Sequence, residues 1–172
     1  QELVVIKTLN DYDAIKIPIG SSNKYPRGKG ILGAQKLNRA EIRKWTEKIY
    51  KISKGEVSVG FYPRSFFKNL GEDVMAAFDP FALEIHLEAG VTRFLISHEF
   101  KHLEEYMKIG RKEYLKGIDG SLADKRIRTY KRERYVFDEL MKERHLLNKA
   151  EIKRAIKYIN ETIEEGKAIL VA

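Results

Sequence analysis

The chain has 172 residues, of which 43% are hydrophobic and 34% are charged, the composition of an ordinary globular domain. It contains no cysteine, which excludes disulfides, thiol nucleophiles and thiolate metal sites. The net charge of +8 favours a polyanionic or acidic partner and carries no information about the fold.

The beginning of the chain is predicted to be an N-terminal arm or connector over residues 1–37. Short β-like runs at 3–6 and 15–19 lead into a stretch rich in glycine, serine, asparagine and proline. Since the first residue is Gln1, we expect a piece of a longer protein. There is no signal-peptide pattern, and no apolar run reaches the ~20 residues of a membrane span.

A single domain is expected over residues 38–172, and it opens with a helix. Asn38 followed by Glu41 is a capping-box pattern, which predicts a helix from Arg39 to about Ile52. Gly55 ends this helix, and the alternating residues 57–61 predict a strand.

Two more strands are predicted at 74–78 and 82–87, joined by a tight turn at Asp79-Pro80. In the second of them, alternation places Leu83, Ile85 and Leu87 on one side. His86 is therefore expected on the solvent side, away from any active site.

Three helical or charged segments follow. The pattern predicts a helix from Val91 to Ile109, ended by Gly110. The basic stretch 111–134 is interpreted as a solvated charged loop, with the lining of a cleft for an acidic partner or substrate as the alternative. A further helix is expected over 131–146.

The last predicted helix covers about 149–165. Asn148 with Glu151 three residues later provides the cap signal, and Gly166 is the expected stop.

His98, Glu99 and His102 form the motif HExxH in the middle of the predicted helix 91–109. At about 100° per residue the two histidines lie only about 40° apart around the axis, so both imidazoles can reach one ion. Glu99 projects beside them, where a carboxylate can take a proton from a water molecule at the metal and pass it to a leaving amine. Two imidazoles with a carboxylate suit Zn²⁺, and an incidental pair of surface histidines is the alternative.

Glu133 is the predicted third ligand. In the helix 131–146 it shares a face with Val136, Phe137 and Leu140, and a carboxylate on an apolar stripe is costly to bury unless it is paired or bound to a metal. The alternative is a glutamate favoured near a helix start by the macrodipole.

Other polar residues of the same region remain open as candidates. Asp138 could hydrogen-bond a ligand histidine or pair with Arg134. Asp138, Glu139 and His145 are competing third ligands, although Asp138 and Glu139 fall off the apolar stripe and a solvated role suits His145 better.

Tyr106 and Tyr135 are candidates for stabilising a tetrahedral oxyanion, since a phenol can donate to it. Tyr106, one turn beyond His102, is the better placed, and the alternative for both is a core residue.

Residues 39–160 resemble the zincin-like metallopeptidase toxin domains of bacterial polymorphic and contact-dependent toxins. The resemblance lies in the hairpin leading into RFLISHEFKHLEEYMKIGRKEYL and in the later stretch RERYVFDELMKERHLLNKAEIKRAIKYIN. The spacing from His102 to Glu133 is longer than in compact gluzincins.

This resemblance implies an α+β zincin-like fold: a small, twisted, mostly antiparallel sheet on the HExxH helix, with further helices after it. It implies an edge strand along which substrate backbone can pair, and Glu133 as a gluzincin-style ligand. It also implies a protein or peptide substrate, a carrier that delivers the domain into the cytoplasm of a target cell, and a cognate immunity protein.

The main hypothesis is thus a zinc endopeptidase toxin with Glu99 as the general base. A basic nucleic-acid-binding or nuclease toxin is the alternative, supported by the net charge. The chain has no phosphate-gripping glycine loop and no aromatic and basic RNA-reading motif, which counts against it. A zincin scaffold that only binds is the third hypothesis.

Overall fold

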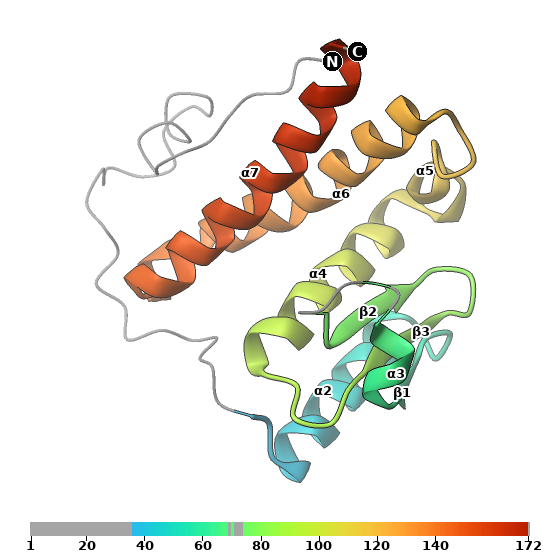
Figure 1. Cartoon of the computed structure of the whole chain (residues 1–172). Helices are drawn as coiled ribbons and strands as arrows, with labels where there is room; N and C mark the ends of the chain where they lie inside the picture. The colour runs from blue at the N-terminus through green and yellow to red at the C-terminus, as the bar shows by residue number, and fades with distance from the viewer. Residues whose placement is uncertain (1–35, 69, 71–73, 172) are drawn as a thin grey trace. The chain divides into compact units, whose positions relative to one another are not determined.

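The computed structural model describes residues 36–68, 70 and 74–171, with side chains described up to residue 162. The described residues form two compact units, one ending at Leu115 and the other beginning at Lys116. The fold is α+β, with an open three-stranded sheet and mostly helix (Figure 1). Residues 1–35 of the expected arm lie outside the described residues, so the arm stays a prediction.

The first described helix, α2, spans Arg39–Ile52, as its cap signal predicts. The Asn38 side chain accepts a hydrogen bond from the Glu41 amide at 2.9 Å, and the Glu41 carboxylate accepts one from the Asn38 amide at 3.4 Å. This reciprocal capping satisfies two amides that a helix start leaves without intrahelical partners. Ile49 of this helix is buried and packs in the core of the first unit.

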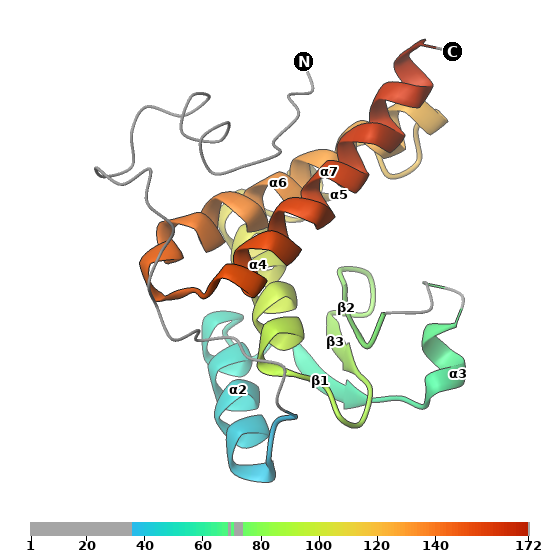
Figure 2. The same ribbon diagram turned by 60° about the vertical axis from the view of Figure 1, so that its left-hand side comes forward.

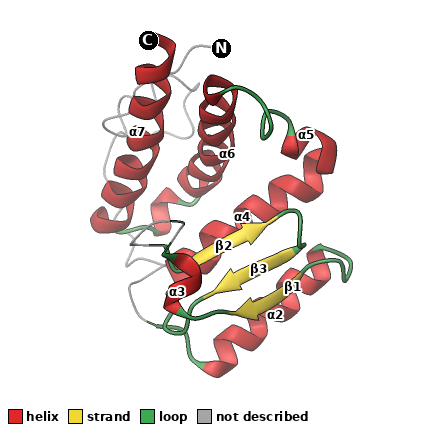
Figure 3. Ribbon diagram, turned by 45° about the vertical axis from the view of Figure 1, so that its right-hand side comes forward, coloured by secondary structure: helices red, strands yellow, loops and turns green. Residues whose placement is uncertain are grey.

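The sheet contains β1 (Ser58–Phe61), β2 (Ala76–Asp79) and β3 (Glu84–Leu87), in the order β1-β3-β2. The predicted hairpin is confirmed, because β2 pairs antiparallel with β3. However, β1 pairs parallel with β3, so the expectation of a mostly antiparallel sheet is wrong (Figure 3). The tight turn between β2 and β3 allows only antiparallel pairing of these two strands. The connection from β1 to β2 is longer and contains α3 (Arg64–Phe67), so it leaves the direction of β1 unspecified.

The HExxH helix is α4, which spans Arg93–Ile109. It starts two residues after the predicted start, and its N-cap, Thr92, accepts a hydrogen bond from the Leu95 amide. Gly110 ends it with φ 84°, a left-handed conformation that glycine adopts without a Cβ penalty.

Apolar residues on one side of α4 make the core of the first unit. Ile96, Phe100 and Leu103 are buried in one cluster with Ile85 and Leu87 of β3. The helix contacts both β2 and α2, and the two helices cover the same face of the sheet (Figure 3). This packing fixes the rotation of α4 about its axis, and so fixes where its other side points.

The other face of the sheet buries His86, which corrects the prediction that this histidine is on the solvent side. Its exposure is 7%, and the rings of Tyr62 and Phe66 pack edge-on against it. The Glu84 carboxylate lies 3.2 Å from His86 Nε2 and accepts a hydrogen bond from the Tyr62 hydroxyl, which raises the pKa of Tyr62. Strand alternation correctly places His86 on the face opposite Ile85 and Leu87. It does not predict that the segment containing α3 covers that face and buries His86.

The second unit consists mainly of α6 (Leu122–Lys142) and α7 (Lys149–Val171), which pack side by side (Figure 2). A short 3₁₀ helix, Arg144–Leu146, connects them. The loop interpretation of the basic stretch 111–134 is wrong, because α5 (Arg111–Leu115) and the first part of α6 occupy it. Lysine and arginine are good helix formers, and a Ser121–Asp124 capping box starts α6 nine residues before the predicted helix.

The final helix begins where predicted, at the reciprocal hydrogen bonds between Asn148 and Glu151. It continues through Gly166 to Val171, so the predicted stop at Gly166 is wrong. Glycine inside a helix costs about 1 kcal/mol, which the rest of the helix can offset. None of the helices in the described part of the chain combines the length and the apolar character that a membrane span needs.

Candidate metal centre

Two histidines project from α4 on the side turned away from its core residues. At about 100° per residue, His98 and His102 lie roughly opposite Ile96, Phe100 and Leu103 around the helix axis. His102 is 6% exposed and His98 is half-buried. The core packing of α4 therefore positions both imidazoles.

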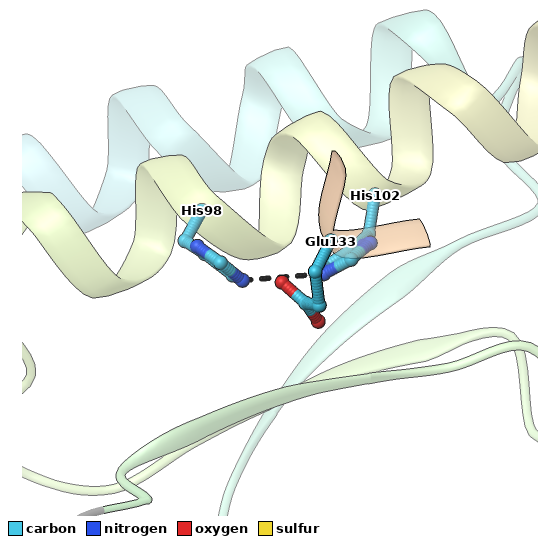
Figure 4. Close-up of side chains that lie close together, drawn as sticks. All are labelled: His98, His102 and Glu133. Atoms are coloured by element: carbon cyan, nitrogen blue, oxygen red, sulfur yellow. Dashed lines mark hydrogen bonds between the residues drawn. The ribbon is translucent and has the colours of Figure 1, made fainter. Parts of the chain in front are cut away.

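The two imidazoles converge on a common point. His98 Nε2 and His102 Nε2 are 3.2 Å apart, and the ring planes are inclined at 70° (Figure 4). In a tetrahedral zinc site with Zn–N bonds of 2.0–2.1 Å, two ligand nitrogens are separated by about 3.3 Å. The observed separation fits two nitrogens bound to one zinc ion.

Glu99 is fixed on the side of α4 that contacts the sheet. Its carboxylate Oε2 accepts a hydrogen bond from the Phe78 amide of β2 at 2.8 Å. Since β2 is an edge strand of the described sheet and Phe78 donates to Glu99, this amide points away from β3. Sequence reasoning missed this contact, because pairing between a helix side chain and a strand amide has no sequence signal.

Comparison with known families identifies the class of protein. Residues 33–164 match the family described as metallopeptidase toxin 4. The chain belongs to the metallopeptidase toxin 4 family. The match includes α2, the sheet, α4, α5, α6 and most of α7. No curated protein and no solved structure gave a significant match.

Membership of a metallopeptidase toxin family implies peptide hydrolysis with a metal ion, and favours this reading over a nuclease. The convergent histidines of α4 provide donors for such an ion, and with no cysteine in the chain the remaining ligands must be oxygen or imidazole. The residues of the metallopeptidase toxin domain thus fit the metal that its family name requires.

Glu133, the predicted third ligand, belongs to α6 in the second unit. It lies eleven residues after Leu122, the first residue of α6. The expectation that Glu133 is near the start of its helix is therefore wrong. The macrodipole acts on the first turn only, and the alternative reading of Glu133 thereby loses its basis. The helix does place Glu133 on the stripe of Val136, Phe137 and Leu140, all three of which are buried.

The competing acids of α6 have basic neighbours. Asp138 pairs with Arg134 Nε at 2.9 Å, which confirms the predicted ion pair, and Glu139 pairs with Lys142 at 2.7 Å. Burial by itself lowers the pKa of Arg134, but the hydrogen bond and charge of Asp138 outweigh it and raise that pKa. His145 is exposed on the 3₁₀ helix, which suits the solvated reading.

Tyr106 lies one turn beyond His102, as expected, and is 7% exposed. Its ring packs edge-on against Phe78 and Tyr114, within the core cluster of the first unit. Tyr135 is half-buried on α6. A catalytic role for either phenol stays a prediction.

Proposed function

We propose that this domain is a zinc endopeptidase whose metal is held by His98, His102 and Glu133. The observation that carries the proposal is the 3.2 Å separation of the two Nε2 atoms on one helix turn, in a member of a metallopeptidase family. Two imidazoles and a carboxylate leave the fourth tetrahedral position for water or substrate, the usual arrangement of catalytic zinc.

The assignment of Glu133, the third side chain drawn in Figure 4, is supported from within α6. It shares the apolar stripe of that helix with the buried Val136, Phe137 and Leu140, which Asp138 and Glu139 do not. A carboxylate in such a position is stabilised by a cation.

Glu99 is the general base in this proposal. Bound zinc would supply a Lewis acid that polarises the peptide carbonyl and makes water more acidic. Glu99 accepts the proton of the attacking water and delivers it to the nitrogen of the leaving amine. The Phe78 amide, which donates to Glu99 Oε2, holds the carboxylate in one orientation.

The substrate would lie as an extended strand beside β2, with the Phe78 amide reserved for Glu99. Backbone pairing with an edge strand binds a peptide without regard to its side chains. Tyr106 is our candidate for an oxyanion donor, to be tested by Tyr106→Phe, which keeps the ring packing and removes only the hydroxyl.

The biological setting is also part of the proposal. The family name describes a toxin, which supports a domain that a larger carrier delivers into the cytoplasm of a target cell. A producing cell would need a cognate immunity protein to block such a peptidase.

The test is the substitution Glu99→Gln, with Glu104→Gln on the same helix as its matched control. We expect Glu99→Gln to bind one zinc per chain but to lose peptide cleavage about 10²- to 10⁴-fold, the usual contribution of general acid–base catalysis. Glu104→Gln should keep both properties. Undiminished cleavage by Glu99→Gln would show that Glu99 is not the base.

A further inference from the structure

The tip of the β2–β3 hairpin is a hydrogen-bonded loop that exposes a phenylalanine. Asp79 Oδ1 accepts hydrogen bonds from the amides of Phe81 at 2.9 Å and Ala82 at 3.0 Å. Such an Asx-type turn fixes the backbone of the loop. Phe81 is nevertheless 58% exposed and lies outside the core cluster.

Arg111, the first residue of α5, lies against this ring. Its guanidinium is 5.7 Å from the centre of the Phe81 ring, and its Nη1 donates to the Pro80 carbonyl at 2.8 Å. Among the described residues no carboxylate forms an ion pair with Arg111, which is exposed. A guanidinium has five N–H groups, so this one can still bind a carboxylate through two parallel hydrogen bonds.

The pair lies at the end of the strand that carries the Phe78 amide. Phe78 donates to Glu99, and Phe81 follows it by three residues. At 3.2–3.4 Å per residue, a peptide extended along β2 from the Glu99 carboxylate covers about 10 Å in three residues. Because Arg111 Nη1 donates to the Pro80 carbonyl, two residues after Phe78, a side chain of that peptide can reach the Arg111 guanidinium and the Phe81 ring beside it.

We propose that Phe81 and Arg111 form a substrate subsite that selects an acidic side chain about three residues before the cleaved bond. The proposal rests on the peptidase function and on substrate pairing with β2. Antiparallel pairing, the more stable arrangement, puts the N-terminal part of the substrate at the hairpin tip. There the guanidinium binds the carboxylate while the ring packs against its methylene groups.

The experiment uses the zinc-loaded chain and a mixture of ten-residue peptides with randomised positions, with the cleavage sites read by mass spectrometry. We expect aspartate and glutamate to be enriched about three residues before the cut. On matched peptides, acid against amide, kcat/KM should differ by roughly 10- to 100-fold, the range for a hydrogen bond to a charged group. The difference should lie mainly in KM.

Arg111→Glu should abolish this preference and favour lysine at the same substrate position. The control is Lys112→Glu, which makes the same change of charge at an exposed neighbouring residue. It should leave the acidic preference intact. Cleavage with no preference at that position, or an Arg111→Glu profile equal to that of the parent, would overturn the subsite and leave the peptidase function standing. If the zinc-loaded chain cleaves none of the peptides, the proposed function fails and the subsite fails with it.

Discussion

The two compact units of this domain differ in what holds their polar residues in place. In the first, α4 is packed by its apolar side onto the sheet and α2, so the geometry of His98, Glu99 and His102 is set within that unit. In the second, α6 and α7 pack on each other and carry much of the charge. Residues 116–162 have thirteen Lys and Arg against eight Asp and Glu, whereas residues 36–115 have fourteen against twelve.

This difference suggests a division of roles. The histidine pair and the general base depend on core packing, and are expected to keep their geometry as long as the first unit is folded. The position of Glu133 depends on the packing of α6, which buries Val136, Phe137 and Leu140 on the same side of that helix. Substitutions in α6 therefore test whether the second unit contributes to metal binding.

The largest effect is expected for the histidine pair. His98→Ala should lower zinc affinity by more than about 100-fold, since even the residues that only support zinc ligands are worth 10- to 100-fold. Titration with zinc in competition with a chelator measures this, and circular dichroism checks the fold. The exposed His145→Ala is the control and should bind zinc like the parent. Equal loss in both variants would contradict the assignment.

The second unit is tested by Glu133→Ala against Glu139→Ala on the same helix. We expect the first to weaken zinc binding by more than about 10-fold and the second to leave it unchanged, because Glu139 pairs with Lys142. If the affinity is the same in Glu133→Ala and the parent, the ligand set is confined to the first unit.

The smallest effect concerns acid stability in the first unit. The hydrogen bond from Arg93 at 2.7 Å, and next that from the Asn38 amide, lower the pKa of Glu41 below its ordinary value of 4.5. A carboxyl whose pKa is lower in the folded chain stabilises it above the unfolded pKa, and this contribution is lost as the pH falls through the folded value.

Urea unfolding at about pH 6 and about pH 3 should therefore show a smaller loss of stability for Glu41→Gln than for the parent. Glu47→Gln, an exposed position on the same helix, is the control and should behave like the parent. An unchanged pH dependence in Glu41→Gln would show that the Glu41–Arg93 pair does not contribute to acid stability.

Local signals predicted the first unit well. Caps at Asn38 and the stop at Gly110 give the bounds of α2 and α4 within two residues, and HExxH on a helix predicts the histidine geometry by itself. The direction of β1 and the burial of His86 depend on α3 and on long-range packing, which no short pattern encodes. In the second unit the run of charged residues was interpreted as a loop, and the Ser121 cap at the start of α6 was missed. Glu133 was therefore expected in the wrong turn of its helix.

The central claim, that one turn of α4 binds zinc through two imidazoles, is tested most directly by zinc-edge X-ray absorption on the chain loaded with one equivalent of zinc. We predict two imidazole nitrogens at about 2.0–2.1 Å, with oxygen in the remaining positions. Coordination by oxygen alone, without imidazole scattering, would contradict it.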